Sequence, residues 1–428
     1  PCSLRSFVLP YYHMKTLEKD LAQRREQHLY RERLVLESPQ AVEVRVGGET
    51  LLSFCSNNYL GLANHPQVIA AFKNGAERYG VGAGASHLVS GHSRAHHALE
   101  EELADFVGTE RALLFSTGYM ANLGVVSALT DRHDVIFEDR LNHASLIDAT
   151  RLARAKVSRY PHVNVNQLAS MLAQARRPGL ITTDAVFSMD GDIAPLAELF
   201  GLAEKHGAWL LADDAHGVGV LGENGRGTFE HLGVKPAPPA ILMGTLGKAF
   251  GTFGAFVAGG AELIETLIQQ ARTYIYTTAL PPAVAEATRA SLKIVRDEPW
   301  RRTQLHALVA RFRRGARSLG FALGESETPI QPLILGAAQR ALDASRRLRE
   351  VGILVPAIRP PTVPAGSARL RITFSAVHTE AQVDRLLDAL AALPRGASTT
   401  APGDVQEAQV SRETGTSEAA VALPPPSL

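Results

Sequence analysis

The sequence contains little cysteine. Only Cys2 and Cys55 occur among its 428 residues, too few for a disulfide framework. This scarcity is typical of a protein of a reducing compartment, so we expect the protein in the cytosol, that is, a cytoplasmic location. No apolar run approaches the ~20 residues that a membrane-spanning helix needs. Residues 1–13 lack the basic segment, apolar core and cleavage site of a secretory signal, so none is expected.

An excess of either charge is missing as well. The 44 Lys and Arg residues balance 43 Asp and Glu residues, for a formal net charge of +1, so we expect no nucleic-acid or membrane surface. We interpret the arginine clusters at 300–302 and 311–314 as solvated helix faces. The hydrophobic share of 45% and the charged share of 20% are those of a globular protein with one large or two ordinary domains.

Short apolar stretches alternate with helical stretches between about residues 50 and 285. The expected strands are 112–115, 135–137, 180–183, 208–212, 240–243 and 255–258. This alternation predicts an α/β fold with a mainly parallel sheet covered by helices. Further along the chain, a second and smaller α/β domain is expected from strands at 330–335 and 369–374 and helices at 340–349 and 380–393.

We therefore expect four parts. An N-terminal arm covers 14–49, starting at the candidate start residue Met14, and contains a charged helix over 16–35. The large domain covers 50–288 and the small C-terminal domain 289–394. Residues 395–428 are rich in Ser, Thr, Ala, Glu and Pro, with too little patterned apolar surface for a fold, so we expect a disordered tail.

Lys248 lies in the glycine-rich run 244–251, directly after the expected strand 240–243. A lysine among glycines can approach a flat cofactor closely, and desolvation favours the neutral amine that forms a Schiff base. Asp213 follows the expected strand 208–212, and a carboxylate is the usual partner of the protonated ring nitrogen of pyridoxal phosphate. Parallel strands end at one edge of a sheet, so the acid and the amine are expected in one crevice. Together they predict a pyridoxal phosphate enzyme, although each motif alone is more often an ordinary loop.

A phosphate site is expected after the first strand of this region. Ser116-Thr117-Gly118-Tyr119 follows the strand 112–115 and opens the helical stretch 120–129. Backbone amides at a helix N-terminus hold phosphate well, so Gly118 and Tyr119 are candidates for this role, and Tyr119 for the ring pocket. An ordinary capped helix is the alternative.

His143 follows the strand 135–137, from where its ring could stack on the cofactor; a structural histidine is the alternative. The glycine-rich run 80–84 lacks a preceding strand and the spacing of a dinucleotide site, and we expect a mobile active-site loop there.

Metal binding is a competing interpretation of the acids and histidines. The candidate groups are His92, His96 and His97 with Glu100, and Asp213 and Asp214 with His216. Neither group has a recognised zinc spacing, so we expect no catalytic metal.

Five motifs together resemble one family, the α-oxoamine synthases, which are pyridoxal phosphate enzymes of the aspartate aminotransferase fold. The motifs are SNNYLGL (56–62), NHASL (142–146), VFSMDGD (186–192), DDAHG (213–217) and GTLGK (244–248). The likeness covers about residues 17–393 and implies fold type I, with a large mainly parallel-sheet domain and a smaller C-terminal α/β domain. Asp184 departs from the pattern, since many members carry glutamate there.

The resemblance also implies residue roles. Lys248 would hold the cofactor, Asp213 would pair with its ring nitrogen, and His143 would stack on the ring. The other implied cofactor contacts are Gly118, Tyr119, Ser188, His216, Thr245, Thr277 and Thr278. Thr277 and Thr278 would reach the phosphate of the partner subunit in a homodimer with shared active sites. The implied substrate contacts are Arg31, His143, Thr362 and Arg371; the planar fork of arginine suits a carboxylate.

The family joins an amino acid to an acyl thioester with loss of carbon dioxide. The segment AIRPPTVP (357–364), followed by ARLR (368–371), implies L-alanine and a pimeloyl thioester as substrates, carried by coenzyme A or acyl carrier protein, in biotin biosynthesis. Lys248 would act as the general base. The alternatives are the same chemistry with other substrates, such as glycine with acetyl-CoA, and a catalytically silent binding protein. Lys248 beside Asp213 argues against the silent protein, which would not need this lysine.

Overall fold

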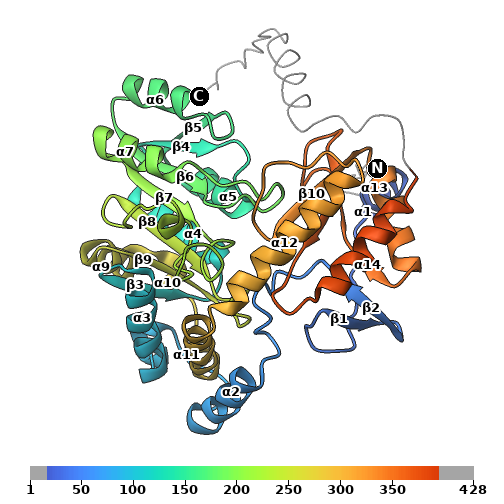
Figure 1. Ribbon diagram of the computed structural model, residues 1–428. Helices are drawn as coiled ribbons and strands as arrows, with labels where there is room; N and C mark the ends of the chain where they lie inside the picture. Colours follow the sequence, from blue (N-terminus) through green and yellow to red (C-terminus); the bar gives the residue numbers. More distant parts are fainter. Residues whose placement is uncertain (1–16, 395–428) are drawn as a thin grey trace, which may run out of the picture.

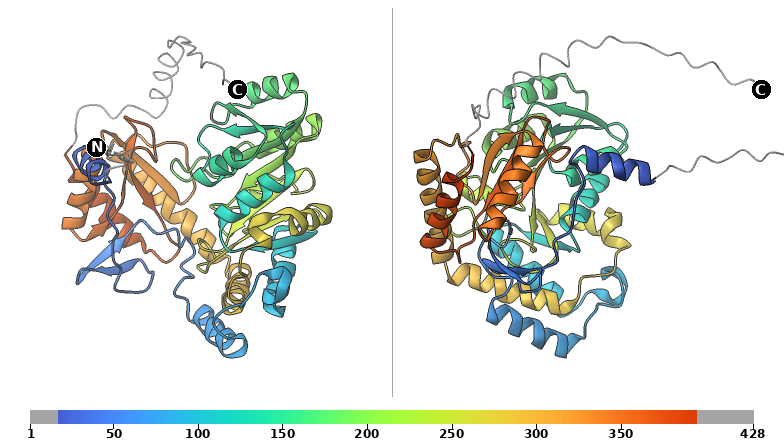
Figure 2. Two further views of the ribbon diagram at one scale, coloured as in Figure 1. Left: turned by 180° about the vertical axis from the view of Figure 1, so that it is seen from behind. Right: turned by 90° about the vertical axis from the view of Figure 1, so that its right-hand side faces the viewer.

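The computed structural model describes residues 17–394, which form two α/β parts (Figure 1). The larger part lies on the left of Figure 1 and the smaller part on the right, and helix α12 (Trp300–Ser318) crosses diagonally between them. The view from behind in Figure 2 shows the same division. The expected disordered tail and the candidate start at Met14 lie outside the described residues.

The larger part is built on a seven-stranded sheet with the order β3-β9-β8-β7-β6-β4-β5. Its strands are β3 (Arg111–Phe115), β4 (Val135–Asp139), β5 (Lys156–Tyr160), β6 (Pro178–Asp184), β7 (Trp209–Asp213), β8 (Ala240–Thr245) and β9 (Ala255–Gly259). Only β9 runs antiparallel to its neighbours in this sheet, which confirms the mainly parallel sheet. All six expected strands are present. The seventh, β5, was missed because it is an edge strand with the polar sequence KVSRY, and edge strands commonly carry charge.

Helices cover both faces of this sheet. The helices of the larger part are α2 (Pro66–Tyr79), α3 (Arg94–Val107), α4 (Gly118–Leu129), α5 (Ala144–Leu152), α6 (Val165–Gln174), α7 (Leu196–His206), α8 (Thr228–His231), α9 (Ala261–Gln270), α10 (Arg272–Ile275) and α11 (Pro282–Asp297), with a π-helical turn η1 (His87–Gly91) before α3. Successive residues of a strand point to opposite faces. Leu211 therefore belongs to the core with α4, α5 and α9, whereas Leu210 belongs to the core with α3, α6 and α7.

The smaller part contains two three-stranded sheets. One joins β1 (Glu43–Val46), β2 (Glu49–Ser53) and β11 (Ile353–Leu354); the other joins β10 (Ile330–Gly336), β13 (Ala368–Thr373) and β12 (Ala357–Ile358). Helices α13 (Ala338–Glu350) and α14 (Glu380–Ala391) complete it, so the strands and helices expected in this region are present. The expected boundaries at residues 50 and 288 fall inside β2 and α11. β2 pairs with β11, and α11 packs on α2 and α3, so the chain leaves the larger part after Asp297.

Two expectations about charged helices were wrong. The helix expected over 16–35 is α1 (Leu17–Glu26), because the chain turns at His28, which has a φ of 57°. Three arginines that we interpreted as solvated are buried: Arg301, Arg302 and Arg313. Their guanidinium groups donate to backbone carbonyls, for example Arg301 to Leu60 at 3.0 Å, so tertiary packing satisfies charges that a helical pattern alone assigns to solvent.

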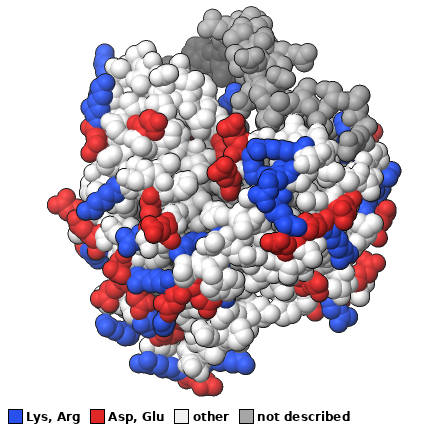
Figure 3. All heavy atoms as spheres, viewed as in Figure 1, with Lys and Arg blue, Asp and Glu red and all other residues white. Residues whose placement is uncertain are grey.

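The described surface agrees with the balanced charge of the sequence. Basic and acidic side chains are interspersed over much of the face shown in Figure 3. Within residues 17–394, no helix has the length and apolar character needed to cross a membrane.

Gly251 fixes the turn that follows Lys248, and alanine there should destabilise the protein by at least ~2 kcal/mol. Its φ is +66°, its amide donates to the Lys248 carbonyl at 2.9 Å, and an added Cβ would lie 2.3 Å from the Ala63 nitrogen. Thermal unfolding measures the effect. As a control, Gly201→Ala in α7 has open space around it and should be neutral or stabilising by about 0.5–1 kcal/mol. Equal stability of the two variants would contradict the strained turn.

Candidate active site

The ends of β7 and β8 bring the predicted acid and amine to one edge of the sheet. Asp213 is the last residue of β7 and lies opposite Met243 of β8, five residues before Lys248. The Lys248 Nζ lies 2.9 Å from the Nε2 of His216, in the loop after β7. Asp213 and Asp184, at the ends of neighbouring strands, are the carboxylates that act on the charge of Lys248. The structure therefore places Lys248, Asp213 and His216 in one site.

Burial lowers the pKa of Lys248 to about 8, although the negative charges of Asp213 and Asp184 oppose the shift. The pKa of an unperturbed lysine side chain is 10.5. A lysine amine with a lowered pKa carries a larger neutral fraction near neutral pH, and the neutral amine is the nucleophile that attacks an aldehyde.

We therefore expect cofactor-free protein to take up pyridoxal phosphate faster as the pH rises, with the rate levelling off above about 8. Below that pH Lys248 is protonated and cannot attack, whereas above it the neutral amine predominates. Rapid mixing at a series of pH values, followed by the visible absorption of bound cofactor, measures this rate. A rate that still climbs steeply above about pH 9 would show that the lysine is not desolvated.

A hydrogen-bonded chain leads from Lys248 to the smaller part of the molecule. The Tyr59 hydroxyl donates to Asn57 Oδ1 at 3.1 Å and lies 2.7 Å from Nδ1 of His216. Nδ1 of His216 must therefore donate to Tyr59, which leaves Nε2 to accept from Lys248. Burial and then the charge of Lys248 hold the pKa of His216 well below its usual range, in keeping with this neutral tautomer. Tyr59 belongs to the SNNYLGL motif, but its partnership with His216 was not predicted.

Asp213 is held in place by two donors. Nδ2 of Asn122 lies 2.8 Å from Asp213 Oδ2, and the amide of Ala215 lies 3.1 Å from Oδ1. The same Asn122 amide donates to Ser145 Oγ at 2.9 Å, which connects α4 with α5. Asn122 was missed by the sequence analysis; the available signal was a polar residue in the otherwise apolar stretch 120–129.

His143 caps the N-terminus of α5, with its ring exposed beside this site. Its Nδ1 accepts from the amide of Ser145 at 3.2 Å, so in the neutral ring Nε2 carries the proton and can act as a donor. The His143 backbone amide donates to both carboxylate oxygens of Asp184, at 3.2 and 3.1 Å. Burial, reinforced by the negative charge of Asp213, raises the pKa of Asp184 well above its usual range. The shorter carboxylate at this position thus reaches the backbone of the His143 loop.

The predicted binding site for the phosphate of the cofactor lies at the N-terminus of α4. Thr117 caps this helix by accepting from the Met120 amide at 3.2 Å, so Gly118 and Tyr119 occupy its first turn. The Ser116 hydroxyl donates to the Thr278 carbonyl at 3.4 Å, which brings the segment 277–278 beside this helix end of the same chain. The Thr245 hydroxyl donates to the Gly254 carbonyl at 3.1 Å, within the lysine loop.

The predicted substrate residues fall into two places. Arg371 is buried next to the lysine, where its charge also lowers the pKa of Lys248. Its Nε donates to the Ser188 carbonyl at 2.6 Å and its Nη1 to Asn57 Oδ1 at 3.2 Å. Arg31 of the N-terminal arm is exposed and donates to Thr362 Oγ1 at 3.1 Å.

The residues at this edge fit pyridoxal phosphate. Lys248 offers an amine for its aldehyde, Asp213 a fixed carboxylate for its ring nitrogen, and the exposed His143 ring a surface for stacking. The first turn of α4 offers backbone amides, which suit a phosphate. Each chemical feature of the cofactor thus has a counterpart among these residues.

Comparisons with known proteins identify the family of this chain. The family model described as aminotransferase class I and II matches residues 49–390. The 8-amino-7-oxononanoate synthase of Thioalkalivibrio sulfidiphilus is 62% identical over 385 residues, which cover 90% of this chain and 98% of that protein. The enzyme of the same name from Methylococcus capsulatus is 62% identical over 379 residues, covering 88% and 98%.

Solved structures show the same fold. A serine palmitoyltransferase of Sphingomonas wittichii superposes with a TM-score of 0.84 at 34% identity, covering 89% of this chain and 98% of that one. A structure described as SPT with a PLP internal aldimine gives 0.84 at 32% identity, with the same coverage. The 8-amino-7-oxononanoate synthase of Francisella tularensis gives 0.69 at 32% identity, covering 84% and 99%. The chain therefore belongs to the class I and II aminotransferase family and, within its fold type I, to the α-oxoamine synthases, as a pyridoxal phosphate-dependent acyltransferase.

Proposed function

We propose that the protein condenses L-alanine with a pimeloyl thioester, releasing carbon dioxide and the thiol, to form 8-amino-7-oxononanoate for biotin biosynthesis. The observation that carries this proposal is the 62% identity, over 98% of their length, to relatives named for that product. The lysine, acid and histidine are shared chemistry of the wider family, so they support the reaction type and not the choice of substrates.

Lys248 moves the proton in this proposal. When bound, pyridoxal phosphate withdraws electrons from the Cα of the amino acid. The Lys248 Nζ, once free, accepts the Cα proton of alanine and later returns a proton to the same carbon after carbon dioxide has left. Its lowered pKa of about 8 suits both transfers, because a base works best with a pKa near the working pH.

The residues around Lys248 would orient the cofactor and the substrate and stabilise the charges that develop on them. Asp213, fixed by Asn122 and the Ala215 amide, would pair with the ring nitrogen of the cofactor and so favour its protonated form. His143 carries its proton on Nε2, so it can donate to the substrate carboxylate or to the oxyanion that forms at the thioester carbonyl. By the resemblance, Ser188 and His216 would hydrogen-bond oxygens of the cofactor and Thr245 would bind its phosphate. His216 would then donate from Nε2, in place of accepting there from Lys248.

We assign Arg371 and Arg31 to the two carboxylates of the substrates, one on alanine and one at the far end of the pimeloyl chain. Arg371 is buried beside Lys248, which suits the carboxylate of alanine. Exposed Arg31 of the N-terminal arm contacts exposed Thr362 of the smaller part, and this pair suits the far carboxylate of the pimeloyl chain.

Arg31→Ala should raise the KM for pimeloyl-CoA at least about tenfold while leaving kcat nearly unchanged. A charge-assisted hydrogen bond contributes about 1.5–3 kcal/mol, and 1.4 kcal/mol is a factor of ten in binding. Heptanoyl-CoA, with the same chain length but no terminal carboxylate, is the matched control and should show the same KM with both enzymes. An equal rise in KM with both thioesters would refute the carboxylate role.

Thiol release tests the substrate assignment. Purified protein is given pimeloyl-CoA with L-alanine, glycine or L-serine, and we expect rapid release with alanine alone. Release with glycine alone would identify a sister activity of the family, such as condensation of glycine with an acyl-CoA. Bound cofactor without turnover on either a coenzyme A or an acyl carrier protein donor would favour the silent binding protein.

We also propose a homodimer with shared active sites in the cytoplasm. The match of Thr277 and Thr278 to positions that contact a partner's phosphate supports the shared site. Light scattering measures the mass directly, and a monomer that retains full activity would refute the shared site.

A further inference from the structure

A second cluster of ligand-type side chains lies away from the lysine site, around the start of α3. Within residues 17–394, two groups of three His, Cys, Asp or Glu side chains have ligand atoms within 4.8 Å of one another. One is His87, His92 and His96; the other is His92, His97 and Glu100. The second group lines a cleft of about 570 Å³ that also contains Tyr274 and Arg111. None of these residues belongs to the catalytic site described above.

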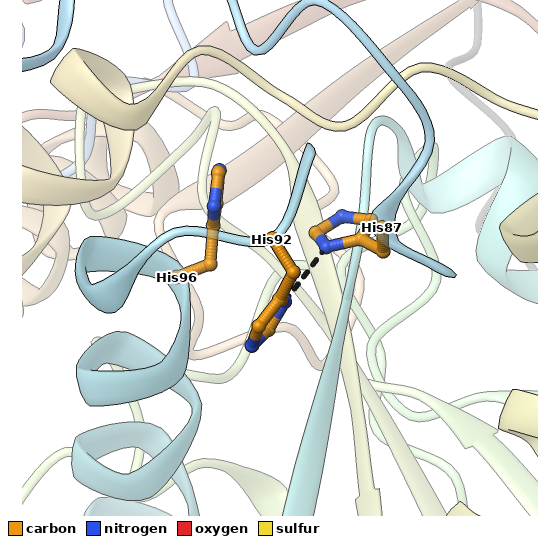
Figure 4. Close-up of side chains that lie close together, drawn as sticks. All are labelled: His87, His92 and His96. Carbon is orange, nitrogen blue, oxygen red and sulfur yellow. Dashed lines mark hydrogen bonds between the residues drawn. The ribbon is translucent and has the colours of Figure 1, made fainter. Parts of the chain in front are cut away.

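His96 is unsuited to be a ligand. Its Nδ1 accepts from the Ser93 amide at 3.0 Å, and its Nε2 then donates to the Leu280 carbonyl at 2.7 Å. Both ring nitrogens are therefore already used. The His96 ring packs against the rings of His87 and His92, with centroids 5.1 and 5.7 Å away. Figure 4 shows a hydrogen bond between His87 and His92 and none from either of them to His96.

We propose that His92, His97 and Glu100 bind a zinc-class divalent metal ion, with water completing the coordination. His92 and Glu100 are already close to the required geometry, because Nε2 of His92 lies 3.9 Å from Oε2 of Glu100. Two ligand atoms on one tetrahedral zinc ion lie roughly 3.4 Å apart, since each bond is about 2.0–2.1 Å long. Nε2 of His97 lies 3.4 Å from Oε1 of Glu101, so His97 would turn from Glu101 to the ion, which its exposed side chain is free to do. The ligand atoms of the three residues lie within 4.8 Å of one another, so side-chain rotations would close the remaining difference.

Neighbouring residues hold two of the ligands in place. Glu100 Oε1 accepts from the Leu114 amide of β3 at 2.9 Å, which leaves Oε2 for the ion. Nδ1 of His92 lies 2.9 Å from Nδ1 of His87, whose ring stacks on Tyr274 at 4.9 Å. When His92 donates from Nδ1 to His87, its Nε2 presents a lone pair to the cleft. A ligating imidazole that donates from its other nitrogen is the usual arrangement at protein metal sites.

The donor set selects the class of ion. Two imidazoles and one carboxylate suit Zn²⁺, whereas Mg²⁺ and Ca²⁺ prefer sites made of oxygen atoms. The positive charge of Arg111 at the cleft is partly offset by its pair with Glu265, at 3.1 Å. An ion here would join α3 to the turn η1, next to Ser86, which bridges to Thr278. The ion would thus stabilise the packing of α3 and η1 near the predicted phosphate site, and it would take no part in the reaction.

Titration calorimetry tests the site. Untagged holoenzyme, treated with a chelator and exchanged into metal-free buffer, is titrated with Zn²⁺ and separately with Mg²⁺. We expect one tight Zn²⁺ per chain and no comparable Mg²⁺ binding. His97→Ala should weaken Zn²⁺ binding at least about tenfold. The control His133→Ala, an exposed histidine elsewhere in the larger part, should bind as the wild type does.

Two readouts separate metal binding from a folding defect. The metal-free melting temperatures of wild type and His97→Ala should agree, and Zn²⁺ should raise only that of the wild type, because a ligand of the native state stabilises it. Co²⁺ should give visible d–d absorption with wild type and His133→Ala that is lost in His97→Ala. Absence of stoichiometric Zn²⁺ binding, or equal binding by the two variants, would overturn the proposal.

Discussion

Lys248→Ala should lower kcat by at least about 10³-fold, which corresponds to roughly 4 kcal/mol of transition-state stabilisation. In the proposed mechanism the variant lacks the amine that would hold the cofactor and move the Cα proton. It should also lose the visible absorption of lysine-bound cofactor, measured on the purified protein together with steady-state thiol release.

An exposed lysine provides the control for this variant. Lys205→Ala, in the last turn of α7, should keep both the absorption and the rate of the wild type. Near-normal turnover by Lys248→Ala would contradict the proposed role of Lys248 as cofactor anchor and general base.

Asp213→Asn should lower kcat by about 10²-fold or more while the protein remains folded. Asparagine has nearly the same shape but no negative charge, so it cannot keep the ring nitrogen of the cofactor protonated. Losses of 10²–10³ are typical when one preorganised electrostatic group is removed from an active site. Parallel measurements of kcat and of thermal unfolding separate the chemical effect from a structural one.

The adjacent Asp214 is the matched control. Its carboxylate accepts from the Thr228 amide at 2.7 Å and the Thr228 hydroxyl at 2.6 Å, and burial raises its pKa to about 7. Asp214→Asn leaves one of these donors poorly paired, so it should cost about 1–3 kcal/mol of stability and change kcat little. If Asp214→Asn reduced kcat as strongly as Asp213→Asn, the special role of Asp213 would be refuted.

The sequence predicted the parts of the fold that depend on local pattern. Buried strands such as 240–243 are short apolar runs, and the polar residue that follows each one marks the edge of the sheet where ligands bind. Lys248 and Asp213 were proposed in this way, and the structure places both residues at that edge. β5 escaped because an edge strand does not need an apolar run.

The rest depends on contacts between segments far apart in the sequence. Arg301 looks like a solvated helix residue until Leu60, 241 positions away, supplies a carbonyl for it. The pairing of Tyr59 with His216 and of Asn122 with Asp213 likewise arises only when the chain has folded. A sequence pattern can therefore predict candidate reacting groups, whereas the residues that orient them become visible only in the folded structure.

Isotope tracing tests the central claim most directly. Wild-type protein is incubated with pimeloyl-CoA and L-alanine labelled with ¹³C in its carboxyl group, and product, thiol and carbon dioxide are quantified. The account predicts unlabelled 8-amino-7-oxononanoate, with labelled carbon dioxide and free thiol in equal amounts, because decarboxylation removes the labelled carbon. Label retained in the condensation product, or thiol released without consumption of alanine, would contradict it.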